Sequence, residues 1–243
     1  MGRKVLSATL LVSLPLVACP AALVAQLTVE RTIFVSATGT PEENCATLRS
    51  VLGSIPSPRV ISNAYLVNVG PGDYDCGTNI VSIPSYVEVV GAGQVTVIRG
   101  SVNSPIFGVV DFDDVIGSSL RSLKVKNSGI PDSIAVTVYQ SFDIELRDVE
   151  LSPRQSGATI STGLLAYSDS LLGSDFCQVE VWNSQLFGFK GATTRQAVSG
   201  ASVRITFYSA YFGAQTDTSA GGEVKCASST WALSPLDSDC LLL

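Results

Sequence analysis

From Tyr65 onward, short apolar runs alternate with turns rich in Ser, Gly and Asn, and one hydrophobic pattern recurs. The pattern is an apolar residue, two residues of any kind, a small or apolar residue, one residue of any kind and a last apolar residue. Its copies begin at Leu120, Leu146, Val181 and Phe207, at intervals of 26, 35 and 26 residues. A further strand precedes each copy, such as IFGVV or IAVTV. Repeats of this length, each packing its inward side chains on the next, predict an all-β right-handed parallel β-helix.

The long interval contains residues 168–176, which we interpret as a loop inserted into one coil. The competing fold is an antiparallel sandwich, whose hairpins favour Asn-Gly or Asp-Gly turns. Neither dipeptide occurs in the chain, whereas corners such as NSG and GAG do. The turn chemistry therefore favours the β-helix.

One helix is predicted, just before the β region. Thr40 and Glu43 have the spacing of a capping box, with Pro41 at the first helical position. Apolar residues follow at helical spacing, and Pro56 ends the segment. A stack of coils exposes unpaired strand edges at its ends, so we expect this helix to cover the first end. The predicted organisation is an N-terminal strand and capping helix over residues 26–56, β-helix coils over residues 57–213 and a C-terminal cap over residues 214–243.

Residues 1–25 have the form of a secretory signal peptide. Arg3 and Lys4 precede an apolar stretch too short for a comfortable membrane span, and Ala25-Gln26 is the candidate cleavage point. Cleavage removes both basic residues and takes the net charge from −6 to about −8. An alternative is lipidation at Cys19, because the segment LVAC resembles a bacterial lipobox. Both routes predict an exported protein, extracellular or periplasmic in the first case and lipid-anchored in the second.

Export permits disulfides, and five cysteines follow the predicted signal segment. Cys45 lies in the first turn of the predicted helix, and Cys76 follows the first strand of the coil that the helix should cover, so we expect these two to pair. Cys226 and Cys240 flank a turn-rich tail that has little core of its own, and we expect a second disulfide there. Cys177, at the end of the predicted inserted loop, is expected to remain a free thiol.

Residues 65–101, YLVNVGPGDYDCGTNIVSIPSYVEVVGAGQVTVIRGS, resemble the N-terminal coils of pectin-lyase-like β-helices. The shared form, general also in pectinesterases, is a strand, a Pro-Gly-x-Tyr turn, a hydrophobic strand, then Gly-x-Gly and Thr-x-Ile-x-Gly-Ser. The nearer likeness is to uncharacterised exported bacterial members, which share Pro-Gly-x-Tyr-Asp, Pro-x-Tyr-Val-x-x-x-Gly-x-Gly and C-terminal cysteine features, here KCASSTW and PLDSDC. The resemblance covers most of residues 33–243. It implies the fold, and it carries no activity by itself.

The motifs of known enzymes of this superfamily are missing. The chain has no histidine, which excludes the Gly-His-Gly element of polygalacturonases, a Ser-His-Asp triad and a Cys-His pair. The Asp-Phe-x-Phe-Gly, Gln-Asp-Thr and Gly-Arg-Pro-Trp segments of pectinesterases do not occur, and VVDFDD at 109–114 continues differently from the first of them. Asp111, Asp113 and Asp114 have the oxygen ligands that calcium prefers, but a solvated turn is the interpretation we favour. We therefore expect no metal and no cofactor.

The net charge of −6, without a basic run, also argues against nucleic acid as a partner.

Two sets of side chains are candidate sites. Asp113, Gln140 and Asp169 each follow a leading strand at a similar distance, so the repeat predicts that they form an acidic column along the helix. Two carboxylates that flank a sugar are the catalytic pair of glycosidases. The simpler interpretation is a row of exposed polar residues.

The second set is aromatic. The residue after each first apolar position should point outward. These residues are Arg121, Arg147, Trp182 and Tyr208. The next outward column ends at Tyr211, so Trp182, Tyr208 and Tyr211, extended by Phe187, would form an aromatic patch on the last coils. Such a patch suits sugar rings or a protein surface. The alternative is that residues 214–243 fold back and cover it.

Two functions agree with these observations. The first is an exported, non-catalytic β-helix that binds a polysaccharide or a partner protein, such as one of the cell envelope. The second is a degenerate or atypical carbohydrate-active enzyme, similar to pectinesterases or pectate lyases and acting on acidic polysaccharide. The missing motifs favour the first, and the negative charge also disfavours tight binding of polyanionic pectin.

Overall fold

The computed structural model of the chain describes residues 31–56, 60–169 and 176–242, apart from residues 189, 197–201, 213–214, 221–222, 228–229 and 232–239. Only the backbone is described for Phe176, Gln196 and Ser202, and for the described residues from Phe212 onward. The predicted signal peptide, the alternative lipidation at Cys19 and most of the predicted loop insertion lie outside this part of the chain.

Neighbouring strands are parallel throughout the described residues. The main path of the larger sheet is β1 (Arg31–Val35), β2 (Tyr65–Val69), β5 (Val87–Val90), β8 (Ser119–Asn127), β10 (Ile144–Pro153), β12 (Phe176–Trp182), β15 (Ser202–Tyr208), β18 (Glu223–Ala227) and β20 (Cys240–Leu242). Its other strands are β3 (Gly72–Asp75), β6 (Thr96–Gly100), β13 (Gln185–Leu186), β16 (Tyr211–Phe212) and β19 (Thr230–Trp231).

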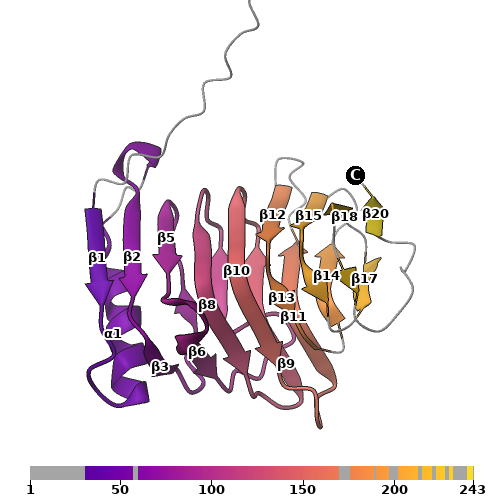
Figure 1. The fold of residues 1–243 in the computed structure, drawn as a ribbon. Helices are drawn as coiled ribbons and strands as arrows, with labels where there is room; N and C mark the ends of the chain where they lie inside the picture. Colours follow the sequence, from indigo (N-terminus) through magenta and orange to yellow (C-terminus); the bar gives the residue numbers. More distant parts are fainter. Residues whose placement is uncertain are drawn as a thin grey trace, which may run out of the picture.

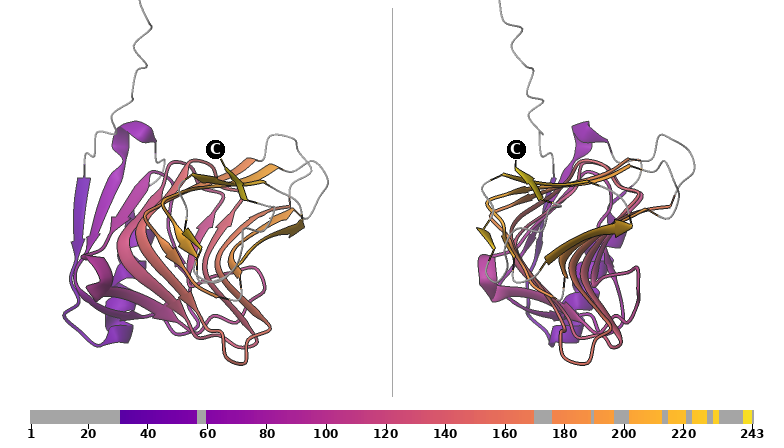
Figure 2. Two further views of the ribbon diagram at one scale, coloured as in Figure 1. Left: turned by 45° about the vertical axis from the view of Figure 1, so that its right-hand side comes forward. Right: turned by 90° about the vertical axis from the view of Figure 1, so that its right-hand side faces the viewer.

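The smaller sheet faces the larger one across the interior. In spatial order it consists of β17 (Gln215–Ala220), β14 (Lys190–Gln196), β11 (Ile160–Ser168), β9 (Asp132–Tyr139), β7 (Val110–Asp113) and β4 (Val81–Ser82). Besides short 3₁₀ turns at Ile61–Asn63 and Gly93–Val95, the described chain contains one helix, α1 (Pro41–Ser54). Figure 1 shows the coils side by side along one axis, and Figure 2 shows strands of successive coils following one another around a common interior. The predicted right-handed parallel β-helix is confirmed.

The register predicted from the repeat is also confirmed. Leu146 pairs with Leu120 on one side and with Val181 on the other, and Val181 pairs with Phe207. All four side chains are fully buried. Neighbouring strands in a sheet lie about 4.8 Å apart, so these side chains form a continuous inward stack along the helix axis.

A left-handed corner residue explains the three-residue spacing in the repeat. Along a regular strand, residues three apart point to opposite faces. The first part of β8 pairs with β5 and the second part with β6, so the chain turns a corner within this strand. Equivalent corner residues recur in successive coils, and all have positive φ: Ser122 (52°), Asp148 (53°), Asn183 (47°) and Ser209 (57°). The corner brings the apolar residues on both sides of it, such as Leu146 and Val149, into the interior.

Helix α1 covers the N-terminal end of the stack, as predicted. Thr40 and Glu43 form the reciprocal capping box. Cys45, Leu48 and Leu52 are buried and belong to the same core as the coils. Apolar side chains on one face of the helix thus close the end of the interior.

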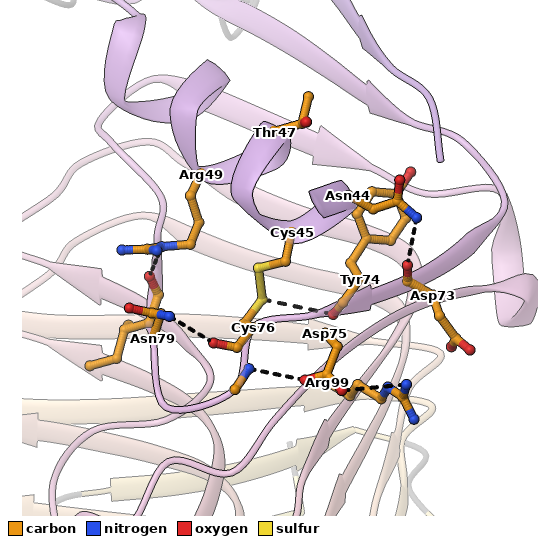
Figure 3. Close-up of a disulfide and its surroundings, with 12 residues drawn as sticks. Asn44, Cys45, Thr47, Arg49, Asp73, Tyr74, Asp75, Cys76, Asn79 and Arg99 are labelled. Atoms are coloured by element: carbon orange, nitrogen blue, oxygen red, sulfur yellow. Dashed lines mark hydrogen bonds and ion pairs between the residues drawn. A yellow bond between two sulfur atoms is a disulfide. The ribbon is translucent and has the colours of Figure 1, made fainter. Parts of the chain in front are cut away.

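A disulfide fastens this helix to the first coil. Cys45 and Cys76 are bonded, with their Cα atoms 5.3 Å apart, as expected from the sequence. Figure 3 shows the bond between α1 and the end of β3, flanked by two hydrogen bonds that also join the helix to the coil. Asn44 Nδ2 donates to the Asp73 carbonyl at 3.1 Å, and Arg49 Nε donates to the Ile80 carbonyl at 3.0 Å.

Three further cysteines lie in the C-terminal half of the chain. Cys177 is a buried free thiol in β12. Cys226 and Cys240 lie in β18 and β20, where their side chains are not described, and their predicted disulfide remains a prediction. In the register of these strands, Cys226 lies opposite Leu242.

The tail continues the parallel sheets. Strands β17, β18 and β19 pair with β14, β15 and β16, so their backbone adds to the stack of coils. This segment falls within residues 214–243, the predicted C-terminal cap. Whether its side chains cover the aromatic patch remains a prediction.

The corner geometry predicts an asymmetric response to substitution at the exposed Asp148. A β-branched residue in the left-handed conformation is strained, and that conformation costs an L-residue roughly 1–2 kcal/mol relative to the right-handed one. Asp148→Val should therefore lower the free energy of unfolding by about 1–2 kcal/mol, whereas Asp148→Gly should leave it unchanged or raise it. Denaturant unfolding of both variants checks this. Ser119→Val, at an extended position of β8, is the control, and an equal loss in the two valine variants would contradict the argument.

Candidate functional site

The outer face of the larger sheet carries a column of aligned side chains that ends in aromatic rings. The register pairs Arg147 with Trp182 and Trp182 with Tyr208. The guanidinium carbon of Arg147 lies 5.3 Å from the centroid of the Trp182 ring. The rings of Trp182 and Tyr208 stack, with centroids 3.7 Å apart and planes 11° apart. Because β10 and β15 flank β12, Arg147 and Tyr208 contact opposite faces of the indole. A ligand can therefore reach the edge of Trp182 but cannot stack on its face without displacing a neighbour.

A second aromatic pair lies beyond the corner. Tyr211 is 38% exposed, and its ring meets Phe187 edge to face, with centroids 6.2 Å apart. The corner residues Asn183 and Ser209 lie between the two pairs in the chain and are exposed. The structure thus places all four predicted aromatic residues on neighbouring coils, as two pairs on two adjoining faces.

Two ion pairs lie on the outer face of the coils that precede the aromatic rings. Arg121 lies 2.5 Å from Glu88, and Arg147 lies 2.6 Å from Glu145. Pairs exposed to this degree contribute little to stability.

The outer face of the smaller sheet carries another column. The rings of Tyr139 and Tyr167 stack with centroids 5.2 Å apart, and the Arg195 guanidinium carbon lies 5.5 Å from the Tyr167 centroid. Asp169 Oδ1 accepts hydrogen bonds from the Tyr139 hydroxyl at 2.5 Å and from Gln140 Nε2 at 2.7 Å. The hydrogen bond to Asp169 is the main cause that raises the pKa of Tyr139.

The predicted acidic column is only partly assembled in this region. Gln140 and Asp169 are in contact, but Asp113 pairs with Tyr139 and is offset from Gln140 by one residue. The offset arises because Asp113 is the last residue of β7, whereas Gln140 is a left-handed corner residue (φ 47°) that follows β9. Burial, and then the charge of Asp114, raise the pKa of Asp113. A catalytic role for the column remains a prediction.

The pattern of residues pointed to Asp111 only as one of three possible calcium ligands in a solvated turn, and it gave no sign that this carboxyl group is buried. It lies between the inward residues Val110 and Phe112, so its side chain points outward, yet it is only 4% exposed. The chain segment before β7 lies over this face, since the Ile106 carbonyl accepts a hydrogen bond from Thr137, the register partner of Asp111. Asp111 Oδ1 has no hydrogen-bond partner, and burial, followed by the charge of Asp113, raises its pKa to about 7. The sequence signal was the Asp-x-Asp-Asp run, which we interpreted as a solvated turn.

Two further features of the described residues bear on function. They contain no cluster of three or more His, Cys, Asp or Glu side chains arranged to hold a metal ion, so Asp111, Asp113 and Asp114 do not form one. Nor do they contain a helix with the length and apolar character needed to cross a membrane.

The stacked parallel sheets, the inward side-chain ladder and the capping helix define the fold as a parallel β-helix. Among solved structures, the chain is similar to Escherichia coli ybhc, with a TM-score of 0.54 and 14% identity over 88% of this chain and 74% of that one. It is also similar to Geobacillus virus E2 ORF18, with a TM-score of 0.50 and 12% identity over 81% of this chain and 42% of that one.

Pectin methylesterases resemble the chain more distantly. The enzyme from carrot has a TM-score of 0.47 and 13% identity over 82% of this chain and 73% of that one. No family model and no curated protein matches the sequence. At these identities the likenesses show the fold alone.

Burial of Asp111 predicts a specific dependence of stability on pH. Its pKa is raised from about 3.9 in an unfolded chain to about 7 in the folded protein, so the folded state holds the proton more tightly. The resulting stabilisation is complete below about pH 4 and is lost as the pH rises to about 7, and it amounts to ~4 kcal/mol at most. Asp111→Asn should remove this part of the pH dependence in denaturant unfolding. Asp143→Asn, at an exposed carboxylate, is the control, and an unchanged slope in Asp111→Asn would show that Asp111 is not the group responsible.

Proposed function

We propose that this chain is an exported, non-catalytic β-helix protein that binds a polysaccharide at the aromatic patch formed by Trp182, Phe187, Tyr208 and Tyr211. The observation that carries the proposal is the partly exposed ring of Tyr211, which Phe187 contacts edge to face, one corner along the chain from the stacked rings of Trp182 and Tyr208. Aromatic side chains present a large apolar area, and a ring held by its neighbours loses little conformational freedom when a ligand binds.

The geometry favours contact with ring edges and with Tyr211. Arg147 and Tyr208 occupy the two faces of Trp182, so the indole supports the surface rather than serving as a free stacking platform. The partly exposed ring of Tyr211 lies one corner further along the chain. A sugar chain that lies across the corner would contact Tyr211 and the exposed polar residues Asn183 and Ser209 together. A partner protein is the other occupant that an exposed aromatic patch suits.

Export is supported by the disulfide between Cys45 and Cys76, because disulfides persist in oxidising compartments and are rare in the cytosol. The same bond links helix α1 covalently to the first coil. A covalent link of this kind suits an exported protein, whose surroundings vary. The proposal therefore places the protein outside the cytosol, where polysaccharides of the cell surface are accessible.

Truncation of Tyr211 should weaken polysaccharide binding. Loss of one aromatic contact is worth roughly 1 kcal/mol, so Tyr211→Ala should reduce affinity about fivefold in calorimetric titrations of the mature protein with a panel of neutral and acidic polysaccharides. Phe34→Ala is the matched control, because Phe34 is 74% exposed in β1 at the opposite end of the molecule. Equal losses in the two variants, or no binding to any polysaccharide, would refute the proposal.

A second candidate function, a carbohydrate-active enzyme of unusual type, is favoured by Asp111. A buried carboxyl group with a pKa of about 7 and an acidic neighbour can exchange a proton near neutral pH, which is the requirement for a general acid or base. Against it, the structure leaves only 4% of Asp111 exposed, so a substrate would need the covering segment to move.

Product release distinguishes the two candidates. We expect the mature protein to release no methanol, reducing ends or unsaturated products from pectins. Turnover that Asp111→Asn or Asp113→Asn abolishes, while the unfolding transition is preserved and Asp132→Asn remains active, would replace the binding proposal with the enzymatic one.

A further inference from the structure

A groove with a volume of about 740 Å³ runs over the outer face of β3, β6, β8 and β10, next to helix α1. Four polar residues lie in one row along it. The register pairs Asp75 with Arg99, Arg99 with Lys126 and Lys126 with Ser152. Arg154 follows at the end of β10 and completes the lining on this side. The groove therefore brings together three basic residues from three successive coils.

These three basic residues are poorly neutralised. The ion pair between Arg99 and Asp75 is long, with 3.4 Å between Nη2 and Oδ2. The buried Nε of Arg99 has no hydrogen-bond partner. Figure 3 shows the two residues near the disulfide. Lys126 is exposed and makes no ion pair with any described residue. Arg154 is exposed, and its Nε donates to the Ser156 carbonyl rather than to a carboxylate.

Three other basic residues of the larger sheet are paired more closely than those of the groove. On the same molecule Arg121, Arg147 and Lys124 each have a carboxylate within 2.9 Å. Strands in a sheet are about 4.8 Å apart, so the basic side chains of adjacent coils repel one another unless an anion lies between them. The chain as a whole has a net charge of −6, which makes a local cluster of unpaired cations unexpected on composition alone.

Three basic and two acidic residues line the groove, and the only ion pair among them joins Arg99 to Asp75. Asp75 partly neutralises Arg99. Glu42, the other acidic lining residue, lies in the first turn of α1, where the positive end of the helix dipole attracts it. Lys126 and Arg154 then remain, beside the exposed Ser101 and Ser128.

We propose that this groove binds a doubly charged tetrahedral oxyanion, a phosphate or sulfate group, through Arg99, Lys126 and Arg154. Lys126 and Arg154 make no ion pair with a described residue, and a dianion can neutralise both of them, whereas a single carboxylate can neutralise only one. The forked guanidinium groups suit two oxygens of one anion, and lysine adds a point charge. The anion can be a free ion or a group carried by a polymer. The site is separate from the aromatic patch and does not depend on the function proposed for it.

Titration calorimetry of the mature protein with sulfate, phosphate and acetate at low ionic strength tests the proposal. Sulfate and phosphate should bind, and acetate should bind at least tenfold more weakly. Hydrogen bonds to charged groups are strong enough that Lys126→Gln and Arg154→Gln should each weaken sulfate binding about tenfold. Arg195→Gln, which removes one charge from the outer face of the smaller sheet, should leave binding unchanged.

The remaining outcomes also decide the question. Equal affinity for acetate, no binding of sulfate and phosphate, or equal losses in Arg195→Gln and Lys126→Gln would overturn the proposal. Unfolding transitions of the variants show whether each is folded, and the exposed positions of Lys126 and Arg154 make them tolerant of substitution. A sulfated or phosphorylated polysaccharide that binds tighter than the free ion, and loses this advantage in Lys126→Gln, would identify a polymer as the source of the anion. Tyr211→Ala should leave sulfate binding unchanged, which separates this site from the aromatic patch.

Discussion

Each coil of this protein depends on the in-register packing of its inward side chains against those of the neighbouring coils. A single coil has no apolar face that it could bury alone, so its stability comes from the coils on either side. Leu120, Leu146, Val181 and Phe207 show the consequence, because they are fully buried in one continuous stack. The left-handed corner residues serve the same constraint, since they turn the chain and keep the residues on both sides of each corner inside.

The same register also organises the outer surface. Whatever side chain follows an inward residue is aligned with its counterpart in the next coil, about 4.8 Å away. Aromatic residues in such columns stack, as Trp182 does on Tyr208 and Tyr139 on Tyr167. Opposite charges pair in the same way along the sheet, as Lys124 does with Glu150. Where two basic residues are neighbours in such a column, as Arg99 and Lys126 are, the register alone does not pair both of them with an acidic residue.

Packing between coils does not account for the N-terminal end of the stack or for the segment before β7, and other interactions hold these parts in place. Among the described residues no coil precedes β1, and α1 supplies apolar surface at this end of the stack. The disulfide from Cys45 to Cys76 and the hydrogen bond from Asn44 hold that helix in place. On the smaller sheet, a segment before β7 lies across the outer face and buries Asp111. This burial, rather than any charged partner, accounts for most of the rise in the pKa of that carboxyl group.

The sequence by itself determined the path of the chain. The spacing of apolar residues fixed which side chains face inward, the capping box located α1, and the positions of Cys45 and Cys76 indicated their bond, because each of these depends on local pattern or on the repeat. Only the tertiary structure decided the surroundings of each outward residue. It offset Asp113 from Gln140 through a corner conformation, covered both faces of Trp182, buried Asp111 and gathered Arg99, Lys126 and Arg154 into one groove. These outcomes depend on contacts between coils and on segments that cross the sheet, and neither leaves a periodic signal in the sequence.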